Sequence, residues 1–163
     1  MPITDSQFWR FASMLYRYAD LREILLGLQD DHQVVILELL FAVWLADQGV
    51  AWSKMDHHRS RQHIGSWVDE VVLPLRQLRL HWRATKGRDA GYQHLLSMEL
   101  DAEQHLADLL LDKMPTFDAQ TPCWKLLDAN LLRVLPEDGI ADETRERLMS
   151  LLQEAGLKLG EKP

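Results

Sequence analysis

The chain has 163 residues, of which 47% are hydrophobic and 26% are charged, and this composition suits one globular domain with a single core. Its formal net charge of −7 at pH 7 argues against general nucleic-acid binding. No run reaches the roughly 20 apolar residues that a membrane-spanning helix needs. The first residues lack the pattern of a secretory signal, and the lone Cys123 cannot form an internal disulfide, so we expect a cytoplasmic protein.

Apolar residues recur at helical spacing along most of the chain, which predicts an all-α, single-domain bundle of about six to seven helices. After two predicted helices over about 5–18 and 21–30 comes the run VVILELLFAVWLA, residues 34–46. This run is apolar nearly all round, and Gly49 follows it where a helix often ends. We therefore predict that residues 34–46 form the central helix of the bundle.

Beyond Gly49, the stretch MDHHRSRQHIGSW at 55–67 predicts a helix that breaks at Gly65–Ser66. A helix over 67–86 follows, and Pro74 should kink it because proline lacks a backbone donor. A fifth helix is expected from about 91 to 113, and two more after the loop at 115–122. We interpret 1–114 as a helical core and 122–163 as a C-terminal helical extension packed on the same domain.

Basic residues concentrate in the middle of the chain. Residues 51–90 carry eight Lys/Arg against four acids, whereas both flanking regions are acidic. Spacings of three and four place the arginines after Pro74 on one flank of their helix, where guanidinium groups can bind an acidic partner or an anion. The alternative is that they pair with the acidic fifth helix of the same chain. The candidate binding residues are Arg59, Arg61, Arg76, Arg79, Arg83 and Trp52, the last because its loop position predicts exposure.

Two polar groups are weaker candidates for an acid–base or metal site. Glu38 lies within the apolar run and needs a partner such as Arg10, Arg17 or Arg76, with Asp30 and His32 close by in sequence. Asp101 and His105 share a face of the fifth helix. The histidines at 57, 58 and 63 do not share a face, and no Glu-x-x-His occurs, so we assign no metal, cofactor or catalytic residue.

Four motifs occur in order: FWRFASMLY (8–16), LQDDH (28–32), LLFAVWLADQG (39–49) and WVDEVVLPLRQLR (67–79). They resemble an uncharacterised proteobacterial family of small all-helical proteins, a domain of unknown function. The resemblance implies a soluble all-α domain over roughly 5–110 and no established activity. Gln33 and Leu37 depart from that pattern, which has glycine and asparagine at these positions.

These features favour a non-enzymatic protein-interaction or regulatory module that uses the basic, arginine-striped segment 54–86. Its partner would be another protein or a second copy in a homodimer. Two alternatives stay open. One is a small helical enzyme or metal-binding protein with a His/carboxylate site, and the other is a binder of an anionic small molecule or lipid headgroup.

Overall fold

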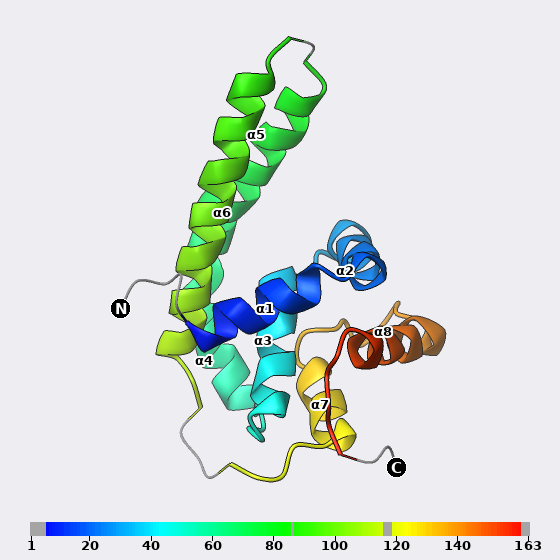
Figure 1. Ribbon diagram of the computed structural model, residues 1–163. Helices are drawn as coiled ribbons and strands as arrows, with labels where there is room; N and C mark the ends of the chain where they lie inside the picture. Colours follow the sequence, from blue (N-terminus) through cyan, green and yellow to red (C-terminus); the bar gives the residue numbers. More distant parts are fainter. Residues whose placement is uncertain (1–5, 86, 116–118, 161–163) are drawn as a thin grey trace.

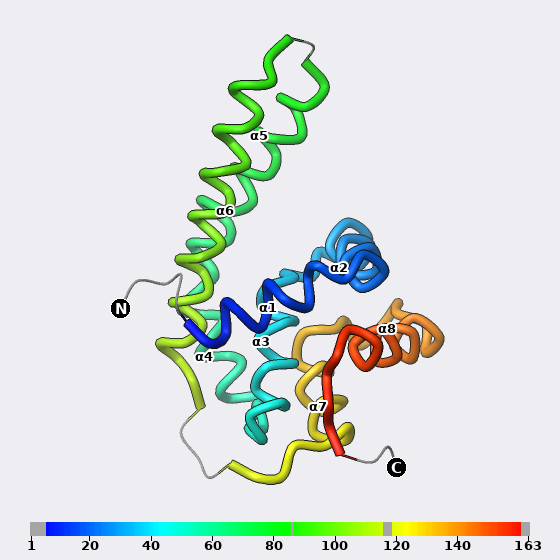
Figure 2. Tube along the Cα trace, in the orientation of Figure 1, coloured from blue at the N-terminus to red at the C-terminus, as the bar shows by residue number. Residues whose placement is uncertain are grey.

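The computed structural model describes residues 6–85, 87–115 and 119–160, and all regular structure in these ranges is helical (Figures 1 and 2). The all-α prediction is therefore confirmed. The elements are α1 (Gln7–Tyr16), α2 (Ala19–His32), α3 (Ile36–Asp47), α4 (Lys54–Trp67), the π-helix η2 (Val68–Val72), α5 (Leu73–Arg83), α6 (Asp89–Asp112), α7 (Trp124–Leu131) and α8 (Asp142–Glu154). Because α4, η2 and α5 are continuous, the described residues form seven helical rods, within the predicted number.

Helix α3 is the centre of the fold, as the apolar run predicts. Every residue from 37 to 46 is buried, and α1, α2, α6 and α7 all pack against α3. Aromatic rings join α1 to α3: the Phe8 ring lies edge-on to Phe41 with centroids 5.1 Å apart, and 5.5 Å from Trp44. Burial of these large side chains away from water is the main term that stabilises such a core.

Glycine is required at position 49, where the chain leaves α3. Gly49 has φ of 72°, a conformation that side-chain-bearing residues rarely adopt. A Cβ here would also overlap the carbonyl of Gln120, whose N–H donates a 2.8 Å hydrogen bond to the Gly49 carbonyl. The close approach of two backbones thus fixes the segment that precedes α7 against the end of α3.

The rod from Lys54 to Arg83 differs from the sequence prediction. Ser53 caps it by accepting a hydrogen bond from the Asp56 N–H, and the helix then continues through Gly65–Ser66, where we predicted a break. That prediction is wrong because glycine and serine lower helix stability without ending a helix that packing supports. The distortion instead occurs at η2, which ends two residues before Pro74. A wider turn is expected there, because a proline ring clashes with the carbonyls of the preceding helical turn.

The C-terminal helices share the core of the rest of the molecule. Apolar residues of α7 and α8 belong to the same buried cluster as those of α3. Helix α7 packs on α3 and α8 packs on α2, where the Tyr18 hydroxyl donates to Glu154 over 3.1 Å. The division of the chain at residue 114 stays a prediction. No described helix has both the length and the apolar character needed to span a membrane.

Candidate functional site

The helical hairpin of α5 and α6 stands out from the body of the molecule (Figure 1). Gly87, with φ of 75°, lies in its turn. The Trp82 ring lies between the two helices near the tip of the hairpin. Its indole N–H donates a 2.9 Å hydrogen bond to the Arg88 carbonyl, and the ring lies so close to Gly91 that a Cβ there would overlap it. The packing of tryptophan on glycine thus holds the two helices close together at the outer end.

Ion pairs hold the two helices together at the base of the hairpin. Arg76 lies 3.2 Å from Glu99 and 3.5 Å from Glu103, and Arg79 also pairs with Glu99. Glu99 is buried and both arginines are largely covered. The structure thus follows the alternative in which part of the arginine stripe docks on the acidic fifth helix of the same chain.

Two side chains at this cluster, Glu103 and Tyr16, have raised pKa values. Burial, together with repulsion from Glu99, raises the pKa of Glu103 to about 7, although Arg76 and Arg79 oppose the shift. Burial and the nearby Glu103 also raise the pKa of the Tyr16 hydroxyl. Perturbed groups of this kind gather at functional sites more often than elsewhere. Glu103 is therefore a carboxyl that can gain or lose a proton near neutral pH.

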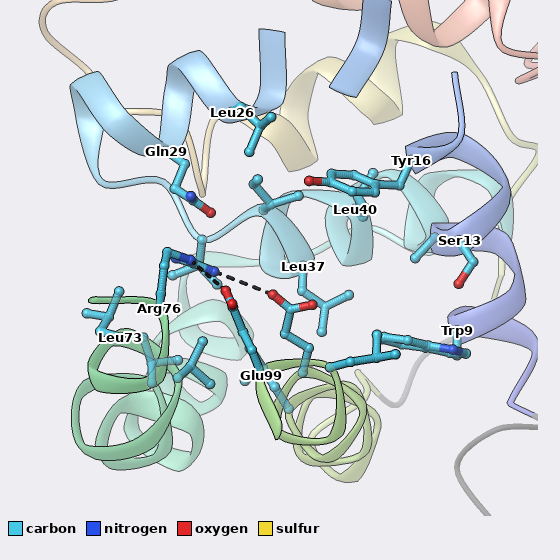
Figure 3. Close-up of a pocket in the computed structure, with 18 of the residues that line it drawn as sticks. Trp9, Ser13, Tyr16, Leu26, Gln29, Leu37, Leu40, Leu73, Arg76 and Glu99 are labelled. Atoms are coloured by element: carbon cyan, nitrogen blue, oxygen red, sulfur yellow. Dashed lines mark hydrogen bonds and ion pairs between the residues drawn. The ribbon is translucent and has the colours of Figure 1, made fainter. Parts of the chain in front are cut away.

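The cluster forms one wall of a cavity of about 260 Å³ between the hairpin and α1, α2 and α3 (Figure 3). The lining is mostly apolar, and Trp9, Leu37 and Leu40 contribute to its inner surface. Gln29 and Arg76 extend into the cavity from two different helices (Figure 3). A largely apolar cavity with a few convergent polar groups is the usual form of a binding site.

Replacing Glu103 by glutamine is expected to remove a pH dependence of stability. The folded-state pKa of about 7 exceeds the ordinary 4.5, so stabilisation by the bound proton is complete below about 4.5 and is lost as pH rises through about 7. The free energy of unfolding of the wild type, relative to Glu103→Gln, should therefore fall between pH 5 and pH 8. We expect a fall on the order of 1 kcal/mol, because solvent screens a side chain that is 33% exposed.

Urea denaturation of the two proteins at both pH values measures this difference. Glu70 is an exposed carboxylate outside this cluster and provides the control, since Glu70→Gln should change the free energy of unfolding by no more than about 0.5 kcal/mol at either pH. A constant difference in unfolding free energy between wild type and Glu103→Gln across this range would show that Glu103 titrates normally.

A second ionic cluster surrounds Glu38, which is completely buried. The Glu38 Oε1 atom lies 2.6 Å from His57 Nε2 and accepts a 2.9 Å hydrogen bond from Arg61 Nε, while Arg61 Nη2 lies 2.8 Å from Oε2 as an ion pair. The predicted partners Arg10, Arg17 and Arg76 are wrong, because the partners come from the first two turns of α4. The cluster is packed against the Trp52 ring, 4.9 Å from that of His57, so it fits a structural ion pair.

The other predicted residues take no part in the ion pairs of these two clusters. Trp52 is 2% exposed, so its predicted exposure is wrong: its ring packs edge-on against Phe41 within the core. Asp30 and Asp101 are exposed, and His32 ends α2. His105 packs its ring against Trp67 at 4.5 Å. Among the described residues, no group of three or more His, Cys, Asp or Glu side chains could hold a metal ion.

Arg59 and Arg83 are the candidate arginines that stay exposed. Arg83 lies near the tip of the hairpin, and Arg59 borders a shallow hollow with Gln62, His63 and Lys113. Gln29, Tyr16 and Glu103 are site residues that we did not predict as a group. Their sequence positions carry no shared periodicity, because the fold brings them together from three helices.

The comparisons with known proteins agree with the resemblance noted in the sequence. No curated protein and no solved structure matches the chain. A family model described as a protein of unknown function (DUF2390) matches residues 7–110, which span α1 to nearly the end of α6 and include both ionic clusters and the cavity. The chain therefore belongs to the DUF2390 family of proteins of unknown function.

Proposed function

We propose that this protein is a non-enzymatic interaction module that associates with a second copy of itself through the α5–α6 hairpin. One observation carries the proposal. Of the ten large apolar side chains that are exposed within the described ranges, six lie on this hairpin, namely Leu73, Leu78, Leu80, Trp82, Met98 and Leu100. Apolar side chains gathered on one projecting element are typical of an association surface.

Incomplete burial of α5 supports the same proposal. The sequence of α5 has a strongly apolar face, which normally packs against a core, yet none of the residues of this helix is buried. Two helices alone cannot cover an apolar stripe from all sides, whereas four helices in a bundle can. Pairing two hairpins would supply the two missing helices.

Charge favours a second copy over an unrelated partner. Helix α5 carries three arginines and no acid, whereas α6 carries six acids and no Lys or Arg. A two-fold axis presents the same surface from both subunits, so it can place α5 of one copy against α6 of the other. Arg83 is exposed on α5, and Asp101 is exposed on α6, so both can contribute to such a contact.

The proposal narrows the predicted basic surface. Arg61, Arg76 and Arg79 are held in ion pairs within the chain, so Arg83 is the predicted arginine of the hairpin that is exposed for such a contact. The lone, partly buried Cys123 is compatible with a reducing cytoplasm, where we place the association.

Replacing Leu78 by glutamate is expected to convert a dimer into a monomer. Leu78 is 52% exposed on the hairpin, so a charge there disrupts association with little effect on the fold of the subunit. Leu132→Glu is a matched control, since this leucine is 48% exposed just after α7 and outside the hairpin. Light scattering during size-exclusion chromatography measures the mass of both. Equal masses for the two variants would refute the assignment of the interface to the hairpin.

A further inference from the structure

The cavity at the base of the hairpin has the dimensions of a small-ligand site. At about 260 Å³ it exceeds the roughly 150 Å³ that accommodates benzene in an engineered protein cavity, and it is just below the roughly 300–1,000 Å³ of sites for drug-sized ligands. The lining residues Leu26, Leu73 and Leu100 are exposed, so the cavity opens to solvent beside these side chains. A ligand with a compact apolar group can therefore enter the cavity and fit inside it.

Two polar groups of the lining have unused hydrogen-bonding capacity. The side-chain oxygen of Gln29 is buried and has no hydrogen-bond partner within the described part of the chain. Arg76 uses Nε and Nη2 to reach Glu99 and Glu103, which leaves its Nη1 group free in the hydrogen bonding that the structure describes. A guanidinium has five N–H donors, and an amide can present either its oxygen or its NH₂ group after a half turn. Both groups lie on the cavity (Figure 3).

We propose that this cavity binds a small amphipathic carboxylic acid, with its apolar body between α1, α3 and α6 and its carboxylate on Arg76 beside Gln29. The arginine is the natural receptor, because guanidinium and carboxylate form charge-assisted pairs. The inference does not rest on the proposed self-association: Leu73 and Leu100 belong to both surfaces, but Leu26, at the same mouth, lies on α2 outside the hairpin.

Charge balance explains how the ion-pair cluster can accept an anion. Arg76 and Arg79 are balanced by Glu99 and Glu103, so an added carboxylate would leave the cluster with one excess negative charge. Glu103 removes this excess by taking up a proton, because burial and Glu99 already raise its pKa to about 7. The protonated Glu103 no longer attracts Arg76, whose Nη2 then turns to the incoming carboxylate.

The titratable and charged groups around Glu103 come from several helices. Glu99 lies on the same helix, Arg76 and Arg79 face it from α5, and Tyr16 faces it from α1. Helix α3 contributes apolar side chains, such as Leu40, to the lining of the same cavity. Since burial and Glu99 already favour the protonated form, an anion beside Glu103 would favour it further. Binding should therefore take up a proton.

Titration calorimetry with octanoate tests the proposal, with octylamine as the cationic analogue and octanol as the neutral one. Measurement at pH 7 in two buffers of different ionisation enthalpy gives the number of protons that binding exchanges. We expect octanoate to bind most tightly and to take up about half a proton, since Glu103 is about half protonated in the free protein. Octylamine that binds as tightly as octanoate, or no binding of octanoate, would overturn the proposal.

Three variants locate the site. Glu103→Gln should bind octanoate without proton uptake, whereas Glu70→Gln, at an exposed position on η2, should behave as the wild type. Arg76→Gln should weaken binding at least ~tenfold through loss of a charged hydrogen bond. Leu100→Trp narrows the mouth at a 49% exposed position and leaves the ion pairs intact, so it should also weaken binding. Proton uptake that persists in Glu103→Gln would refute the role of this carboxyl.

Discussion

Replacing Arg61 by methionine is expected to lower the free energy of unfolding by about 3 kcal/mol. The substitution removes the guanidinium that binds both oxygens of the completely buried Glu38. A buried carboxylate without its cation carries a large desolvation penalty, and losses of 3–5 kcal/mol are typical. We expect the lower end of this range because His57 still contacts Glu38. Urea denaturation monitored by tryptophan fluorescence measures the change.

Replacing Glu38 itself is expected to cost much less. In Glu38→Met the buried charge disappears, and Arg61, whose side chain is 40% exposed, can turn to solvent. The double variant Glu38→Met/Arg61→Met should therefore be more stable than Arg61→Met alone, which is the sign expected when an uncompensated buried charge is removed. If Arg61→Met proves as stable as the wild type, the cluster does not hold the carboxylate as described.

Replacing Asn130 by alanine is expected to cost about 3 kcal/mol for a different reason. Its buried amide accepts a 2.8 Å hydrogen bond from the Trp52 N–H and donates to the carbonyls of Val50 and Ala42 over 2.9 and 3.3 Å. The shorter side chain leaves the first two of these backbone groups buried without a partner, at roughly 1–3 kcal/mol each. The side chain thus joins α7 to the chain that leaves α3.

Lys125→Ala provides the control for Asn130→Ala, because Lys125 is exposed on the same short helix. Its free energy of unfolding, measured by urea denaturation, should stay within about 0.5 kcal/mol of the wild-type value. Equal effects of the two substitutions would mean that helix propensity, and not the lost hydrogen bonds, determines the result.

The central helix could be predicted from the sequence because its signal is local. Residues 34–46 are apolar on nearly all faces, which predicts a buried helix, and every residue from 37 to 46 is buried in the structure. The acidic character of α6 and the arginine spacing on α5 are also local features. Which flank of α5 faces α6 depends on packing, so the sequence left two alternatives for Arg76 and Arg79.

The sites were harder to predict because they depend on long-range contacts. The apolar run around Glu38 predicts that this carboxylate is buried, but its partners lie on a helix whose direction the sequence does not set. Trp52 lies in the loop between α3 and α4, yet its ring packs edge-on against the rings of Phe41 and His57. Asn130 carries one usable signal, since it follows Leu127 by one helical turn on an apolar face.

Sedimentation equilibrium of the wild-type protein over a range of concentrations tests the proposed self-association most directly. The subunit mass is 19.0 kDa, so we expect the measured mass to approach about twice that value as concentration rises. A mass that stays at 19.0 kDa at every concentration would contradict the account, because the apolar side chains of the hairpin would then face water in the native protein.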